Sequence, residues 1–392
     1  MHGSAAVMHA LAMNDDCTVD LAEREAWLIA HRTPGLGNLR LAALHERFGS
    51  MRAALAADRA MLRACGLPEA LCSELAHAGR APVAADLGWL EAAPNRHLLT
   101  LADPDYPPLL RRLENAPPVL FVEGDLNALW RAQIAIVGSR NASRSGLGIA
   151  RDFAAHFARL GIVVSSGLAE GIDGAAHAAC LDAGGSTIAV CGTGLDRVYP
   201  HRHRELAQRI VQQGALVSEF PIGTPPLPEH FPRRNRIIAG LALGTLVVEA
   251  SLKSGSLITA RLAAECGREV FAVPGSIHDP RARGCHELIR NGATLVTAAE
   301  QLVEALQPIG HELGAALRAR LAAQPAPANT AASSDAGHAR LLDAIGFAPT
   351  DFDSLVAATG LTAGAISSML TALELDGHVA DLGGGRYQRL AR

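Results

Sequence analysis

Short runs of apolar residues recur at regular intervals between Gln133 and Leu306, and helical patterns separate most of them. The runs are rich in β-branched side chains, which favour strands. Those expected to form strands are Ile134–Val137, Ile162–Ser165, Thr187–Val190, Leu216–Val217, Thr245–Val248, Val270–Val273 and Thr294–Val296. Continuously apolar strands that alternate with helices are typical of a parallel sheet with both faces covered. The pattern therefore predicts an α/β core with a doubly wound parallel sheet.

Glycine- and serine-rich turns follow most of these strands, at the sheet edge where doubly wound proteins bind their ligands. After the first strand, Gly138 permits a close approach of the backbone, and Ser139 with the following amides could hold an anion at a helix N-terminus. Arg140 adds a positive charge. A plain strand-to-helix turn is the alternative, but a second turn of this kind, with Ser166 and Gly167, favours an anion site. The GSRNASRSGLG segment is neither a GxGxxG fingerprint nor a P-loop, so no nucleotide cofactor is expected.

A cluster of arginines precedes the apolar segment IIAG, which anchors one end of it. We expect these arginines to reach outward, and Phe231 to stack on a base as in single-strand binders. Lys253 stands at the start of another helix, in the sequence Lys-Ser-Gly-Ser, and marks a further amide-and-hydroxyl site. The members of the cluster are Arg233, Arg234, Asn235 and Arg236.

Asp173 and His177 lie four residues apart on a predicted helix and share one face. They could form a catalytic carboxylate–imidazole pair. Alternatively, the aspartate stabilises the helix N-terminus and the histidine is held beside it. The sequence offers no nucleophile or metal partner at matching spacing, which favours the structural role. We therefore predict no catalytic residue, no metal site and no cofactor.

The flanks of the core have other patterns, which divide the chain into five parts. These are a disordered leader (1–20), an Ala- and Leu-rich helical domain (21–100), the α/β domain (101–307), a flexible Pro/Ala/Ser-rich linker (308–337) and a winged helix (338–392). The proline-rich stretch 103–125 is expected to be an extended connector with one short helix. The recognition helix of the winged unit would be Ala363–Leu375, which has no Arg or Lys, so protein contact is favoured over DNA contact.

Composition adds constraints on compartment and partners. The chain has 392 residues and a formal net charge of −4, which argues against indiscriminate binding to polyanions. Its seven cysteines form no CxxC pair, as expected for reduced thiols in a cytoplasmic protein. No signal peptide is evident. The longest uncharged apolar run, Ile237–Val248, is shorter than the roughly 20 residues that cross a bilayer.

An ordered series of motifs along residues 103–306 resembles the DprA (Smf) family, the DNA-processing proteins of bacterial natural transformation. The motifs are GSR at 138–140, SGLAEGIDGAAH at 166–177, YPHRHREL at 199–206, SEFP at 218–221, FPRRNRIIAGL at 231–241, VVEASLKSGSLITA at 247–260, VPGS at 273–276 and LIRNGA at 288–293. The helical N-terminal part resembles the family's SAM-like domain, and the C-terminal part resembles its winged helix.

The resemblance implies an extended Rossmann fold and a homodimer formed through it. It also implies a non-enzymatic protein that protects incoming single-stranded DNA and helps load RecA in the presence of single-strand-binding protein. The DNA contacts that it implies are Gly138, Ser139, Arg140, Ser166, Gly167, Arg233, Arg234, Asn235, Arg236 and Lys253. His286 stands where the family commonly has Asn, which puts a specific amide contact there in doubt.

Two other functions remain open at this point. One is a nucleotide-processing enzyme of the lysine-decarboxylase-like phosphoribohydrolase type. Its PGGxGTxxE loop is matched here only by GLALGTLVVEA, which contains Glu249 but no PGG. The other is a regulator that binds double-stranded DNA through the winged helix.

Overall fold

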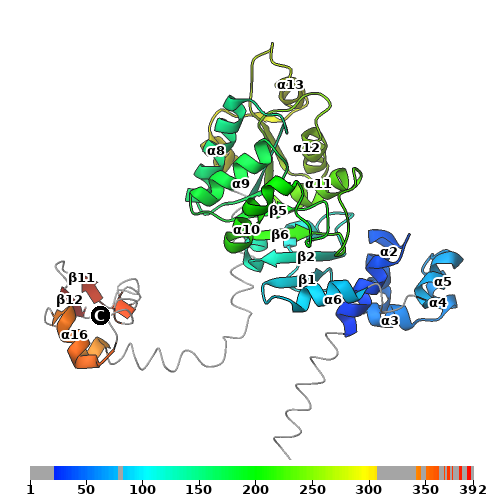
Figure 1. Ribbon diagram of the computed structural model, residues 1–392, viewed down its shortest axis with the longest axis horizontal. Helices are drawn as coiled ribbons and strands as arrows, with labels where there is room; N and C mark the ends of the chain where they lie inside the picture. Colours follow the sequence, from blue (N-terminus) through cyan, green and yellow to red (C-terminus); the bar gives the residue numbers. More distant parts are fainter. Residues whose placement is uncertain are drawn as a thin grey trace, which may run out of the picture. The chain divides into compact units, whose positions relative to one another are not determined.

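The computed structural model describes residues 22–77 and 83–306 of the chain (Figure 1). Toward the C-terminus it describes residues 341–345, 350–361, 366, 369–370, 373, 379–381 and 386–389. The predicted leader and linker, and most of the predicted recognition helix, lie outside the described residues. The chain divides into two compact units, Met1–Leu317 and Arg318–Arg392.

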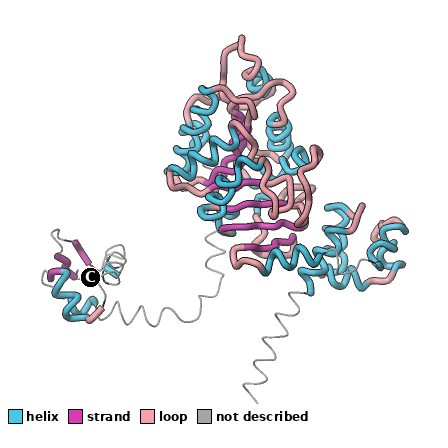
Figure 2. The backbone as a smooth tube through the Cα atoms, in the orientation of Figure 1, coloured by secondary structure: helices cyan, strands magenta, loops and turns pink. Residues whose placement is uncertain are grey.

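One twisted sheet forms the centre of the first unit, and within the described residues it contains nine strands in the order β1-β2-β6-β5-β4-β3-β7-β8-β9 (Figure 2). Their bounds are β1 Arg96–Thr100, β2 Val119–Gly124, β3 Gln133–Val137, β4 Val163–Ser166, β5 Thr187–Val190, β6 Ala215–Ser218, β7 Gly244–Val247, β8 Glu269–Ala272 and β9 Thr294–Leu295. The seven strands from β6 to β9 in this order are parallel. The predicted doubly wound α/β fold is confirmed.

The first two strands depart from the prediction. β1 and β2 pair antiparallel with each other, and β2 pairs antiparallel with β6. Most of the predicted connector is irregular and holds the short helix α7, Pro108–Arg111, but residues 119–124 near its end form β2. The strand itself is apolar and its side chains are almost all buried. Prolines stand directly before Val119, and because proline is unfavourable inside a sheet, they made the whole stretch look irregular in the sequence.

Helices cover both faces of the sheet. Helices α8 (Arg144–Arg159), α9 (Ile172–Asp182) and α10 (Arg204–Gln213) lie on one side, and α11 (His230–Leu241) and α12 (Ser256–Glu265) lie on the other (Figure 1). Alternate side chains of β3 show the two layers. Ile134 and Ile136 pack with α8 and α9, whereas Ala135 and Val137 pack with α11 and α12. Helix α13, Arg283–Arg290, and a helix that begins at residue 299 complete the parallel part.

The N-terminal part is helical, as the pattern predicts. It contains a helix over residues 22–32, then α2 Gly37–Phe48, α3 Met51–Ala56, α4 Arg59–Ala64, α5 Glu69–His77 and α6 Ala84–Glu91. Its core joins that of α10 and the adjoining strands in one cluster, which includes the fully buried Trp27 and Leu28. Within the described stretches, no helix is both long and apolar enough to cross a bilayer.

The second unit has its own small core. Strands β10 (Thr350–Asp351), β12 (Arg386–Arg389) and β11 (Val379–Asp381) form an antiparallel sheet beside helix α16, Phe352–Thr359. Asp351 caps this helix by accepting a hydrogen bond from the amide of Ser354. The buried residues are Leu341, Ile345, Leu355, Ile366, Leu370, Leu373 and Val379.

Candidate nucleic-acid interface

An open groove of about 610 Å³ lies at the carboxyl edge of the parallel strands. Its walls come from segments far apart in sequence: the turn after β3, the start of α11 and the turn before α12. The strand order brings them together, because β3 lies between β4 and β7. Of the predicted site residues, the groove is lined by Gly138, Ser139, Arg140, Arg234 and Asn235. We call this hollow the central groove.

The turn after β3 is tightly built. A Cβ atom at Gly138 would lie 2.6 Å from Cγ1 of Ile172 and 3.0 Å from the carbonyl oxygen of Glu249, so only glycine fits. The hydroxyl of Ser139 accepts a hydrogen bond from the amide of Asn141. Arg140 is exposed, and its guanidinium lies over the ring of Phe231, 5.8 Å from the ring centroid. The turn thus presents a cation beside an aromatic face.

The helix N-terminus near this turn is not the open anion site that the sequence suggested. Helix α8 begins only at Arg144, and Ser143 caps it by accepting a hydrogen bond from the amide of Gly146. The carboxylate of Glu249 accepts hydrogen bonds from both the amide and the hydroxyl of Ser143. A carboxylate from the protein itself therefore occupies the positive end of the helix.

The second predicted anion turn is filled in the same way. Ser166 is buried and donates its hydroxyl proton to the carbonyl of Ile136, at 2.6 Å. The amides of Gly167 and Ala169 donate to one carboxylate oxygen of Asp173. Neither Ser166 nor Gly167 lines the central groove. Ser166 and Gly167 therefore support the turn from inside the protein. This burial corrects the expectation that they lie at the surface that meets the ligand.

Arg234 points into the protein, so the expectation that it reaches outward is wrong. The residue is 4% exposed, and its guanidinium donates to the carbonyl oxygens of Gly167, at 2.6 Å, and Val190. A Cβ atom at Gly167 would lie 2.6 Å from this guanidinium, so the glycine makes room for it. Burial lowers the pKa of Arg234 and raises that of Asp173, while the attraction between the two groups opposes both shifts. The backbone carbonyls hold the guanidinium inside the protein, so Arg234 forms part of the wall of the groove and is not an exposed cation.

Arg236 is also buried, and it shares a partner with Arg233. Both donate to the same oxygen of the fully buried Glu219 carboxylate, at 2.5 Å and 2.9 Å. Arg233 keeps 47% of its side chain exposed and lies over the ring of Phe220. The cluster therefore exposes one of its three arginines. Asn235 is buried between helices and donates to the carbonyl of Gly255 at 3.4 Å.

An aromatic pair stands in the open part of the central groove. The rings of Phe231 and Tyr199 have centroids 5.5 Å apart at an angle of 44°. Tyr199 is 47% exposed. Sequence reasoning did not single out Tyr199 as a site residue, although it begins the YPHRHREL motif. Its link to Phe231 depends on tertiary structure.

The two remaining predicted positions lie near or beyond this groove. Lys253 is exposed in the turn before α12, next to Ser254, whose hydroxyl lies 2.7 Å from that of Ser256. His286 belongs to α13, and its Nε2 atom lies 3.0 Å from the carbonyl oxygen of Gly275. His286 does not line the central groove.

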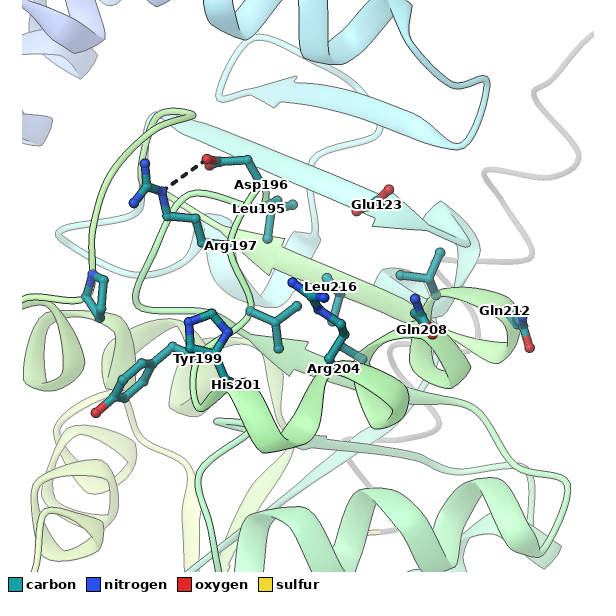
Figure 3. Close-up of a pocket in the computed structure, with 14 residues that line it drawn as sticks. Glu123, Leu195, Asp196, Arg197, Tyr199, His201, Arg204, Gln208, Gln212 and Leu216 are labelled. Atoms are coloured by element: carbon teal, nitrogen blue, oxygen red, sulfur yellow. Dashed lines mark hydrogen bonds and ion pairs between the residues drawn. The ribbon is translucent and has the colours of Figure 1, made fainter.

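A larger hollow of about 700 Å³ adjoins the central groove and shares Tyr199 with it (Figure 3). An ion pair between Asp196 and Arg197 spans its rim, and Glu123 on β2 pairs with Arg96. Its apolar lining includes Leu195, Val198, Ala207, Val211 and Leu216. Arg204 also lines this hollow, but the other charges are paired and acidic groups balance its arginines, so the hollow is less suited to phosphate than the central groove.

Asp173 and His177 do not form a pair, although they share a helix face. Nδ1 of His177 lies 2.7 Å from the hydroxyl of Thr187, which donates its own proton to the carbonyl of Val164. Nδ1 therefore carries the proton and donates. Desolvation by burial lowers the pKa of His177 to about 3. These contacts agree with a structural role for both residues.

The buried His177 predicts an acid-sensitive fold. Because its pKa is about 3 when folded and 6.5 ordinarily, the unfolded chain takes up the proton first as the pH falls. Stability is then lost between about pH 6.5 and 3. For His177→Asn, we expect the decrease in unfolding free energy from pH 7 to pH 5 to be about 2 kcal/mol smaller than in the wild type. Urea titrations at both pH values measure this difference.

The exposed His278 supplies the control, since His278→Asn leaves the buried group in place. It should keep the pH dependence of the wild type. An equal pH dependence in all three proteins would contradict the assignment to His177.

Two features define the class of this protein: a mostly parallel α/β sheet with a groove at its carboxyl edge, and a small separate C-terminal unit. The DNA recombination-mediator protein A family matches residues 97–307, and the DprA winged helix domain matches residues 324–385. The chain therefore belongs to the DNA recombination-mediator protein A (DprA/Smf) family, as its motifs predict. It is a DNA-processing protein with a C-terminal winged helix.

Individual relatives agree with this assignment. The chain is 43% identical to protein Smf of Escherichia coli over 86% of its own length and 88% of that protein. It is 46% identical to the DNA processing protein DprA of Streptococcus pneumoniae over 52% of its length and 72% of the relative. The X-ray structure of DprA from Streptococcus pneumoniae matches with a TM-score of 0.63 and 35% identity, covering 71% of this chain and 97% of that one.

Proposed function

We propose that this protein binds single-stranded DNA along the central groove, without strong sequence preference and without catalysis. The observation that carries the proposal is the exposed Arg140 guanidinium over Phe231, with Tyr199 beside it. A cation for phosphate next to aromatic faces for bases is the combination that single-strand binders use. Every base has a stacking face, so this arrangement does not select a sequence.

The contacts divide between direct and supporting residues. Arg140, Ser139 and Gly138 meet a phosphate at the turn after β3, and the exposed Arg233 and Lys253 add positive charge nearby. The buried side chains of the predicted site hold these surfaces in place. They are Ser166, Gly167, Arg234, Asn235 and Arg236.

Structural roles also account for the residues that an enzyme would need. Glu249, the counterpart of the phosphoribohydrolase glutamate, stabilises the start of α8 through Ser143. Asp173 is held by backbone amides and Arg234. These contacts favour a mediator over a nucleotide-processing enzyme.

Arg140→Ser tests the groove. Arg140 is exposed and makes no buried contact, so the variant should fold normally but bind single-stranded DNA less tightly. Losing one phosphate contact should lower the magnitude of the salt slope of the binding constant by about 0.7. Fluorescence anisotropy with an oligothymidylate at several salt concentrations measures both effects.

Arg144→Ser is the matched control, since Arg144 is also exposed but does not line the central groove. It should bind as the wild type does. If Arg140→Ser binds with wild-type affinity and slope, the groove is not the DNA site.

At the level of the cell, we infer that this cytoplasmic protein protects strands that enter during natural transformation and helps RecA load onto them. The match to a recombination-mediator family supports this role. In a reaction with RecA and DNA coated by single-strand-binding protein, adding the wild type should shorten the lag before RecA hydrolyses ATP. Arg140→Ser should shorten it less. An unchanged lag with the wild type would argue against a mediator function.

We further propose a homodimer through the α/β domain. Strand β9 ends the sheet, its Leu295 is 49% exposed, and Ile277, in the segment after β8, is 74% exposed. Burying such residues against a second copy would remove apolar surface from water. Ile277→Glu with Leu295→Glu should therefore give a monomer in sedimentation velocity.

Met61→Glu changes an apolar residue of the N-terminal helices that is 47% exposed, about as much as Leu295, and should leave the dimer intact. A monomeric wild type, or a dimeric double variant, would refute this interface.

A further inference from the structure

A third hollow, of about 570 Å³, is lined by Arg140 but not by the aromatic pair. It is bounded by the turn after β3, by helices α8 and α9 and by the start of α10. It shares Arg140 and Asn141 with the central groove, so the two hollows adjoin at this turn. We call it the arginine hollow, after Arg140, Arg151, Arg202 and Arg209, which line it.

The charge of the arginine hollow is positive and only partly neutralised. Its four arginines face two acidic residues, Glu170 and Glu205. Arg151 is exposed and has no hydrogen bond or ion pair within the part of the chain that the structure describes. Arg140 likewise keeps its guanidinium free of any carboxylate there, lying on Phe231 instead.

The two arginines that do have partners hold them at the surface. Arg202 pairs with Glu170 at 2.9 Å, and Arg209 pairs with Asp182 at 2.6 Å. Both members of each ion pair have side chains that are more than a third exposed. Exposed pairs of this kind contribute at most about 1 kcal/mol, so a phosphate can replace the carboxylate at small cost.

The backbone under the arginine hollow is fixed in place. A Cβ atom at Gly174 of α9 would lie 2.8 Å from Cε1 of His203, so the helix and the turn at His201–His203 approach each other closely. Nδ1 of His203 lies 2.9 Å from the carbonyl oxygen of Leu168 and ties this turn to the loop before α9. Arg202 therefore projects from a positioned turn, and Arg151 from the exposed flank of α8.

We propose that the arginine hollow is a second phosphate-binding segment, which receives the backbone of a bound strand where it continues past Arg140. The proposal rests on the function proposed for the central groove and extends its footprint across α8 and α9. Unpaired guanidinium groups in an open hollow can bind phosphodiester groups, because a guanidinium donates two parallel hydrogen bonds to a phosphate. The hollow in Figure 3 offers one such guanidinium, that of the exposed Arg204, while its Asp196 and Arg197 pair with each other and its Glu123 pairs with Arg96.

Oligonucleotides of two lengths separate the two segments. A short oligothymidylate of about 6 nucleotides can fill only the central groove, whereas one of about 20 can reach both hollows. For Arg151→Ser with Arg202→Ser, we expect affinity for the short strand to stay at the wild-type value. Affinity for the long strand should fall on the order of tenfold at ~0.1 M salt, and its salt slope should weaken by about 1.4, or 0.7 for each phosphate.

A double variant of equal charge change controls for net charge. Arg159→Ser with Arg261→Ser removes two exposed arginines from α8 and α12 that line neither hollow. It should bind both strands with nearly wild-type affinity. Thermal unfolding of both double variants checks that the fold is kept, as expected for exposed positions.

The outcomes are distinct. Wild-type affinity and slope for the long strand in the Arg151/Arg202 variant, or an equal loss for both lengths, would overturn the second segment while leaving the central groove standing. A wild type that binds neither length would instead refute the proposed function itself, and the extension with it.

Discussion

The buried carboxylate of Glu219 is the constraint on which the groove depends. It lies directly after β6 and holds Arg233 and Arg236, which are three residues apart on one face of α11. An isolated buried carboxylate would be strongly unfavourable, and removing one partner of such a pair costs about 3–5 kcal/mol. The pairing therefore fixes the rotation of α11, which in turn places Phe231 toward the groove and Arg234 toward the sheet.

The same loop joins the N-terminal helices to the α/β domain. Nε2 of His31 lies 2.8 Å from the carbonyl oxygen of Glu219. Three residues further along, the carbonyl oxygen of Ile222 accepts a hydrogen bond from Arg32, and the amide of Ile222 donates one to Asp86. Arg32 and Asp86 also form an ion pair with two hydrogen bonds. A displacement of the helical part would thus act on the loop that holds the arginines of α11.

The residue pattern predicted the parallel core well, because a buried parallel strand is a continuous apolar run. Such a run can be identified in the sequence without knowing which strands lie beside it. It failed at β2, where prolines hid an antiparallel strand. It also failed for Arg234 and Arg236, whose charges looked like surface charges. Their partners lie at the carboxyl ends of three strands that are distant in sequence: the carbonyl of Gly167 just after β4, that of Val190 at the end of β5, and Glu219 just after β6. The sequence alone does not reveal those partners, nor the contact between Tyr199 and Phe231.

Both glycine-rich turns bind anions, but the anions are the protein's own. Glu249 occupies the start of α8, and Asp173 occupies the turn after β4. In a nucleotide-binding protein, these are the positions where a phosphate would be enclosed by amides. With both filled, the carboxyl edge of the sheet offers an open surface of side chains instead of a closed phosphate cradle. Exposed cations and aromatic rings along such a surface suit a chain of phosphates and bases better than a single small nucleotide, because each contact is weak and gains strength only by repetition along a strand.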